Sequence, residues 1–194
     1  MDENGVVELL QAAFLLASSI IAFRAWRTLP RQQYKWFSAW LLIAAICCFV
    51  VFGEEVSWGQ WWFKWTTPDY WKTLNQQHET NLHNTSRYLN QIPRRILEIS
   101  VICAGILIHV VALMPAMKRY LTRRFALIYP PTTLCIAAFC YVLLLIISRL
   151  GRQAYDLSLI PHTSETQETF LFLFVFLYIL ILKKRTDNLR SDRQ

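Results

Sequence analysis

Two adjacent carboxylates follow directly on an apolar run, where the chain reads Gly53–Gln60. If that run is a transmembrane helix, Glu54 and Glu55 lie where the helix meets the membrane edge. An ionisable side chain at such a depth is costly unless it pairs, faces water or binds a cation. Two interpretations therefore stay open with equal weight: the pair marks the membrane edge, or one of its members is a catalytic general base or a cation ligand.

Tryptophans dominate the residues that follow the glutamates. If the helix continues past the apolar run, Glu54 and Trp58 share one face with three further tryptophans. Tryptophan is enriched where a membrane meets water, so an aromatic belt is the favoured interpretation. Trp58 and Gln60 are also candidate binding residues, because they lie in the same short segment as the carboxylates. The other tryptophans of this face are Trp61, Trp62 and Trp65.

A glutamate and a histidine stand four residues apart further along the chain. On a helix, Glu79 and His83 would share one face and could hold one metal ion or one proton. With one of the paired glutamates they would supply the three protein ligands of a catalytic zinc, although this oxygen-rich set suits calcium or magnesium equally well. The alternative is a solvated polar loop whose amides cap turns. A divalent metal ion is thus the cofactor hypothesis, with Asn81 and Asn84 as neighbouring candidate binding residues.

A third acidic group opens the last apolar run. Glu165 and Glu168 are three residues apart and follow Pro161 and His162. Acidic residues in the first turn of a helix interact favourably with its dipole, so we favour a capping role over catalysis. Glu98, at the same end of another apolar run, could join the same cluster.

The composition indicates that membrane helices position these residues. Hydrophobic residues make up 55% of the chain and charged residues 17%, against about 45–50% and about 25% in soluble domains. A membrane-spanning helix needs about 20 apolar residues. We therefore predict an all-α integral membrane protein with about five transmembrane helices. The predicted helices cover residues 6–25, 36–53, 96–114, 125–147 and 166–182.

Basic residues give these helices a direction. Thirteen of the 20 lie at the end of the first helix or in the loop after it, after the third helix, or in the tail at 183–194, and the positive-inside rule makes that side cytoplasmic. All acidic residues except Asp187 and Asp192 lie toward the other side. We expect the N-terminus outside, the C-terminus in the cytoplasm, and residues 54–95 as an outer interfacial segment. The net charge of +7 reflects this topology, so no nucleic-acid partner is expected.

Nothing in the sequence divides the chain into parts. No internal repeat and no Gly/Ser-rich linker is visible, so residues 1–194 are predicted to form a single membrane domain. All five cysteines lie in apolar runs without CxxC spacing, which favours buried thiols over disulfides or zinc ligands. The lipid bilayer is the first expected partner.

Three short strings together resemble a family of uncharacterised bacterial polytopic membrane proteins. They are GEEVSWGQ from Gly53, the dipeptide Thr67–Pro68, and ETNLHN from Glu79. Their counterparts in that family read GEE-hydrophobic-SWGQ, TP and E-x-NLHN, and the strings lie within residues 53–84, about a sixth of this chain. The resemblance implies a bacterial origin and a location in the inner membrane. It implies no activity.

A looser similarity connects the acidic residues at the helix ends with the membrane hydrolases that include alkaline ceramidases and progestin-receptor-like proteins. Those proteins place acidic residues, an asparagine and zinc-binding histidines at helix ends. This sequence departs from them, because it has fewer predicted helices and no HxxxH pair. The similarity implies only a lipid-facing metal site.

Two functions fit these residues about equally well. One is a metal-dependent enzyme that acts on a lipid or lipid-linked substrate at the extracytoplasmic face. The other is a non-enzymatic accessory subunit or assembly factor, which docks a membrane-protein partner on the Trp-rich segment. A transporter is less favoured, because the middle of the predicted helices lacks carboxylates and no paired broken helices are visible.

Overall fold

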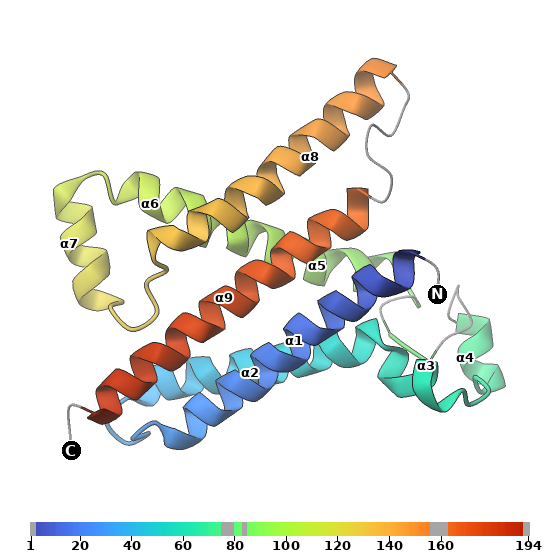
Figure 1. The fold of residues 1–194 in the computed structure, drawn as a ribbon, viewed down its shortest axis with the longest axis horizontal. Helices are drawn as coiled ribbons and strands as arrows, with labels where there is room; N and C mark the ends of the chain where they lie inside the picture. Colours follow the sequence, from blue (N-terminus) through green and yellow to red (C-terminus); the bar gives the residue numbers. More distant parts are fainter. Residues whose placement is uncertain (1–2, 75–79, 83–84, 156–162, 192–194) are drawn as a thin grey trace.

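The described part of the chain folds into helices alone. A computed structural model gives the fold of residues 3–74, 80–82, 85–155 and 163–191 (Figure 1). All regular elements in these ranges are helical, which confirms the all-α prediction. Four of these helices are long and apolar enough to cross a membrane, as a multi-pass membrane protein requires. The four are α1 (Glu3–Thr28), α2 (Lys35–Glu55), α8 (Cys135–Tyr155) and α9 (Thr163–Ser191).

Helix α1 packs against both α2 and α9, and small residues let these helices approach closely. Ala22 and Ala25 of α1 are fully buried and belong to one cluster with Leu41 of α2 and Leu182 of α9. In lipid, apolar side chains gain little from leaving the solvent, so close packing of small residues is a main source of helix association. This cluster forms the first of two cores.

The second core lies where α8 and α9 meet a helical rod made of three consecutive elements. The rod comprises α5 (Arg87–Ile102), the π-helical turn η2 (Cys103–Leu107) and α6 (Ile108–Val111). Gly105, inside the π-helical turn, is buried directly against α8. A Cβ atom there would overlap that of Ala138 and lie 3.0 Å from the Phe174 ring of α9. Glycine therefore sets the distance between the rod and the two long helices.

The rod occupies the place of the third predicted helix but differs from it. It begins at Arg87 rather than at residue 96, and it ends at Val111 before Pro115 starts α7 (Pro115–Arg124). Its first half carries Arg94, Arg95 and Glu98, so the rod is less uniformly apolar than the four long helices.

The fourth and fifth predicted helices have different bounds in the structure. Residues 125–131 are not helical, and the short helix η3 (Thr132–Leu134) that leads into α8 starts after Pro131. The reason is local, since proline lacks an N–H and disfavours the helical conformation in the residue before it. Helix α9 is longer than residues 166–182, because its polar end continues to pack: Thr186 is fully buried.

The charged segments divide between the two ends of the bundle. The N-terminus, α3 (Gln60–Phe63) and α4 (Asp69–Leu74) lie at one end, called here the N-terminal end. The turn between α1 and α2, α7 and the C-terminal part of α9 lie toward the opposite end, called here the basic end (Figure 1).

Candidate functional site

The chain changes direction immediately after the two glutamates. Helix α2 ends at Glu55, and after Val56 the three residues of the short helix η1 (Ser57–Gly59) have positive φ angles of 47°, 56° and 97°. Glycine adopts such angles readily, whereas serine and tryptophan store strain of about 1–3 kcal/mol each. The helix therefore does not continue past the apolar run, and the single helical face expected for Glu54 and the tryptophans does not form.

The turn brings Trp58 back over the end of α2. Its indole Nε1 donates a hydrogen bond of 2.7 Å to the Glu54 carboxylate. The ring lies against Gly53, where an added Cβ atom would come within 2.8 Å of the indole carbons. The glycine before the paired glutamates is thus needed for the close approach of the tryptophan.

Glu54 also holds a segment that lies far away in the sequence. The backbone N–H of Leu82 donates to the second carboxylate oxygen of Glu54 at 2.7 Å. Next to it, the amide of the fully buried Asn81 donates to the Ser57 hydroxyl at 3.0 Å. An ionised acceptor makes hydrogen bonds about twice as strong as a neutral one. The carboxylate therefore acts as an anchor for residues 81–82.

Gln60 makes a second anchor a few residues further on. Its side-chain oxygen accepts a hydrogen bond of 2.8 Å from the backbone N–H of Thr80. Its side-chain nitrogen donates to the Thr67 hydroxyl at 2.7 Å and to the Trp65 carbonyl at 3.3 Å. We call this set of hydrogen-bonded residues the clasp. Its members are Glu54, Ser57, Trp58, Gln60, Trp65, Thr67, Thr80, Asn81 and Leu82.

The clasp unites four predicted site residues, namely Glu54, Trp58, Gln60 and Asn81. They come from two of the strings noted in the sequence, and the side chains of Glu54, Gln60 and Asn81 join those strings to each other. The other predicted ligands, Glu79 and His83, and the binding candidate Asn84 lie outside the described residues. Within the described residues no group of three or more His, Cys, Asp or Glu side chains could hold a metal ion. The metal site stays a prediction.

Glu55 lies near charged side chains of three other helices. It is within electrostatic reach of Glu168 on α9, Glu8 on α1 and Arg94 on α5, as well as of its neighbour Glu54. The two adjacent glutamates therefore belong to different structures: Glu54 to the clasp, and Glu55 to a charged cluster between helices.

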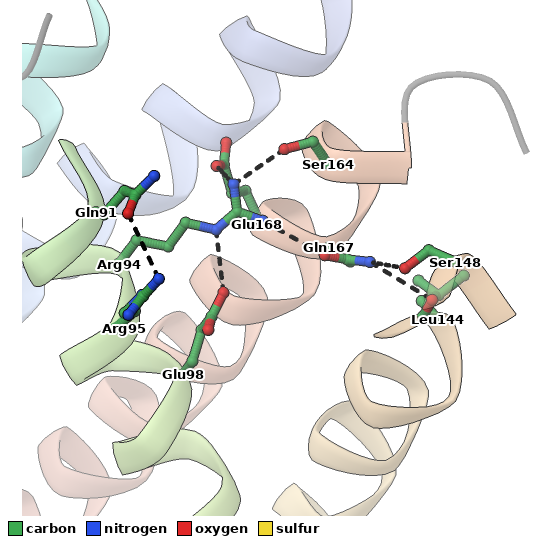
Figure 2. A network of polar contacts seen from close by, with 9 residues as sticks. All are labelled: Gln91, Arg94, Arg95, Glu98, Leu144, Ser148, Ser164, Gln167 and Glu168. Atoms are coloured by element: carbon green, nitrogen blue, oxygen red, sulfur yellow. Dashed lines mark hydrogen bonds and ion pairs between the residues drawn. The ribbon is translucent and has the colours of Figure 1, made fainter. Parts of the chain in front are cut away.

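Arg94 is the centre of that cluster, and Figure 2 shows its contacts. The guanidinium donates to Glu98 at 3.0 Å and to Glu168 at 2.6 Å, and it also donates to Ser164 at 2.9 Å. The three charged side chains are only about a quarter exposed, with fractions of 28%, 23% and 26%. A longer bond of 3.4 Å reaches Gln167. We call these five residues the Arg94 network.

The network extends to a third helix and is approached by a fourth. The side-chain nitrogen of Gln167 donates to the Ser148 hydroxyl of α8 at 3.0 Å (Figure 2). Next to these residues on α9, the amide of the buried Gln11 of α1 donates to the Glu165 carbonyl at 2.8 Å and to the Thr169 hydroxyl at 3.0 Å. Polar side chains thus tie α1, α5, α8 and α9 together near the N-terminal end of the bundle.

The sequence-based prediction missed the role of Arg94, which lies just before the predicted helix at 96–114. The spacing of Arg94 and Glu98, four residues apart, was a signal for an ion pair on one helix. Of the two glutamates with a predicted capping role, Glu165 lies in the first turn of α9 (Thr163–Ser191), whereas Glu168 lies beyond that turn and pairs with Arg94.

The surface next to the clasp is aromatic. Exposed side chains include Trp62 at 55%, Phe63 at 77% and Tyr70 at 72%. A hollow of about 160 Å³, lined almost wholly by apolar side chains, lies between the end of α2 and α3. We call this region the aromatic surface. Its members are Phe49, Phe52, Trp58, Trp62, Phe63, Trp65 and Tyr70.

One ion pair borders the aromatic surface. On α4 the Lys72 ammonium donates to the Asp69 carboxylate at 2.9 Å, and this hydrogen bond holds the pKa of Asp69 below its usual value. Both side chains are exposed, so the pair contributes little to stability.

Comparison of the chain with protein-family models, curated proteins and solved structures finds no match. The geometry alone therefore carries the functional argument.

Proposed function

We propose that this chain is a non-enzymatic accessory subunit or assembly factor of the bacterial inner membrane, which docks a membrane-protein partner on its aromatic surface. In this proposal the rod α5–η2–α6 is the fifth crossing, the whole chain is one membrane domain, and the N-terminal end of the bundle faces outward. The gathering of the basic segments at the opposite end supports this orientation, because positive charge favours the cytoplasmic side (Figure 1).

The observation that carries the proposal is the clasp. Glu54, Gln60 and Asn81 would have to be available to a substrate or a metal in an enzyme, yet each is engaged in hydrogen bonds within the chain. A catalytic base needs a carboxylate directed at the reacting proton. The Glu54 carboxylate instead directs its two oxygens at an indole and a backbone N–H.

The clasp has the effect expected of a docking platform. It holds residues 80–82 against 54–67 and leaves large aromatic side chains exposed beside it. Aromatic residues are enriched at the centres of protein interfaces, since they bury much area with little loss of side-chain entropy. A preorganised surface of this kind binds more tightly than a mobile one, because less ordering is left to the binding step.

The experiment compares the sizes of native complexes extracted gently from membranes. Wild type is expected to migrate as a complex larger than the chain alone, and the double variant Phe63→Ser/Tyr70→Ser is expected to lose that complex. The matched control is Trp36→Ser, because Trp36 is 92% exposed at the far end of α2. The docking proposal is wrong if all three proteins migrate alike, or if the control loses the complex as completely as the double variant does.

The metalloenzyme alternative has its own measurement in the same preparation. Bound metal is determined for purified wild type and for Glu79→Ala and His83→Ala. Stoichiometric metal in wild type that is lost in both variants would support the enzyme and contradict the accessory role. The orientation is tested with a C-terminal reporter that is active only outside the cytoplasm, and we expect this reporter to be silent.

A further inference from the structure

The basic end of the bundle carries a strongly basic helix, α7, whose charges are not paired with acidic side chains within the described residues. Helix α7 contains four basic residues, and all four side chains are exposed. Within the described part of the chain none of them forms an ion pair. The sequence has no acidic residue between Glu98 and Asp156. The four residues are Lys118, Arg119, Arg123 and Arg124.

Apolar side chains accompany these charges instead of being hidden. Leu113 is 80% exposed and Met114 is 56% exposed, just before α7, and Phe125 at its end is 39% exposed. A soluble anion would neutralise the charges but leave these side chains in water. An anionic lipid leaflet offers negative headgroups to the basic side chains and an apolar layer to the neighbouring hydrophobic side chains.

Two of the arginines and a tyrosine line a hollow of about 320 Å³. Tyr120 is three residues before Arg123 and four before Arg124, so the three side chains neighbour one another on the helix surface. The guanidinium group presents a fork of N–H donors that matches two oxygens of a phosphate. The hydroxyl of Tyr120 adds a further donor. This set of donors suits a phosphodiester headgroup.

The hollow is held in place by the rest of the fold. The Tyr120 ring meets Phe125 edge-on, with ring centroids 6.3 Å apart. Just beyond Phe125, the Arg185 guanidinium of α9 donates to the carbonyls of Leu127 at 2.8 Å and Tyr129 at 2.7 Å. A long helix of the bundle therefore fixes the segment that follows α7, and with it the tyrosine.

We propose that Tyr120, Arg123 and Arg124 bind the headgroup phosphate of an anionic phospholipid in the leaflet at the basic end, while Leu113, Met114 and Phe125 insert among its acyl chains. Helix α7 then lies along the membrane surface. The lipid contact is independent of the aromatic surface at the other end of the bundle, so its test does not depend on the docking partner.

The test measures lipid binding to the purified full chain in detergent by native mass spectrometry. Phosphatidylglycerol and phosphatidylcholine with identical acyl chains are titrated separately, and sodium phosphate is added as a third ligand. We expect phosphatidylglycerol to bind at least about tenfold more tightly than phosphatidylcholine, and phosphate not to displace it at millimolar concentration. Equal affinity for the two lipids, or displacement by phosphate, would overturn the proposal.

Two double variants distinguish a specific lipid-binding site from a general electrostatic attraction of the basic end to anionic lipid. Arg123→Gln/Arg124→Gln should weaken phosphatidylglycerol binding by roughly 30-fold, since each basic residue near an anionic surface contributes about a factor of five. The matched control is Lys184→Gln/Arg190→Gln, which removes the same charge from exposed positions of α9 at the same end. An equal loss of phosphatidylglycerol affinity in the two double variants would indicate nonspecific electrostatic attraction and contradict a specific site.

A third variant guards against misfolding of the double variant. Tyr120→Phe keeps the ring contact with Phe125 and removes only the hydroxyl, so the protein should elute as wild type from a sizing column. We expect it to bind phosphatidylglycerol about three- to tenfold more weakly, which is the effect of one neutral hydrogen bond. Unchanged binding by Tyr120→Phe would remove the tyrosine from the site and contradict the three-residue assignment.

Discussion

The guanidinium of Arg94 donates a hydrogen bond of 2.6 Å to the carboxylate of Glu168, and this ion pair joins α5 to α9 across 74 residues of sequence. The same guanidinium pairs with Glu98 of its own helix. Glu8 and Glu55 lie within electrostatic reach of the pair. Arg94 thus stands among carboxylates from four helices, and their mutual repulsion makes its charge important for the packing of the bundle.

Replacement of Arg94 is therefore expected to destabilise the fold strongly. Arg94→Met would leave Glu98 and Glu168 partly buried without their cation. Removing one partner of a buried pair destabilises by about 3–5 kcal/mol, and we expect about 2–4 kcal/mol here because the side chains are about a quarter exposed. Thermal unfolding of the purified protein in detergent should show a midpoint roughly 5–15 °C lower.

The neighbouring arginine supplies the control for this prediction. Arg95 is exposed, and its guanidinium makes a single long hydrogen bond of 3.4 Å to the side chain of Gln91. Arg95→Met should change the midpoint by less than about 2 °C, the shift that corresponds to about 0.5 kcal/mol. If Arg94→Met and Arg95→Met have equal effects, the Arg94 network does not hold the helices together.

The clasp makes a prediction about backbone exchange. Glu54→Ala removes the acceptor of the Leu82 N–H, so that amide should exchange with solvent deuterium about tenfold faster, the equivalent of about 1.4 kcal/mol. Hydrogen exchange read by mass spectrometry on a peptide containing Leu82 measures the change. Asp69→Asn is the control, because Asp69 lies outside the clasp with its side chain 96% exposed. An unchanged Leu82 peptide in Glu54→Ala would refute the anchoring role of the carboxylate.

The long helices were predictable because a helix that crosses a membrane must be apolar along most of its length. This requirement leaves a hydrophobic run that is visible in the sequence. The clasp was not predictable in its geometry. It depends on positive φ angles at Ser57 and Trp58. Serine and tryptophan rarely adopt such angles, so the sequence gives no signal for them. Residue types did identify Glu54, Trp58, Gln60 and Asn81, but only the fold revealed that they bind one another.

The Arg94 network shows the same limit at longer range. Its contact with Glu168 depends on how α5 and α9 pack, and no local pattern in the sequence encodes that. The Pro130–Pro131 pair was the opposite case. It is a local signal for a helix start after Pro131, which is where η3 begins, whereas the predicted range of 125–147 included both prolines.

Close packing at Gly105 predicts a large effect from one added methyl group. Gly105→Ala would place a Cβ atom onto that of Ala138 and against Phe174, so the rod and α8 would have to separate. We expect destabilisation by about 1–3 kcal/mol or more, seen as a lower unfolding midpoint in detergent. Gly5→Ala is the matched control, because a Cβ atom at Gly5 meets nothing within 4 Å.

A second substitution tests whether that cause is steric. Ala138→Gly removes the opposing methyl group, so it should restore part of the midpoint lost in Gly105→Ala, although a glycine inside α8 itself costs about 1 kcal/mol relative to alanine. Strict additivity of the two effects would show that the two positions do not meet.

The anchoring of residues 127–129 to α9 predicts how readily a protease reaches α7. Arg185 donates to two carbonyls of this segment, and the Tyr178 hydroxyl donates to the carbonyl of Ile128 at 2.6 Å. Arg185→Met would leave two carbonyls without these donors and loosen the chain that follows α7. Trypsin cleavage after Arg123 and Arg124 should then accelerate by about tenfold or more, because hydrogen bonds to a charged donor contribute about 1.5–3 kcal/mol each.

Lys184→Met is the control for this last change, since Lys184 is exposed on the same turn of α9 and makes no hydrogen bond within the described residues. Tyr178→Phe should give an intermediate rate, because it removes a neutral donor to the Ile128 carbonyl, leaves both Arg185 bonds in place and keeps the ring. The order of cleavage rates expected is Arg185→Met, then Tyr178→Phe, then Lys184→Met together with wild type. Cleavage of Arg185→Met at the wild-type rate would mean that α7 is positioned by something other than α9, and the hollow at Tyr120 would lose its support from the bundle.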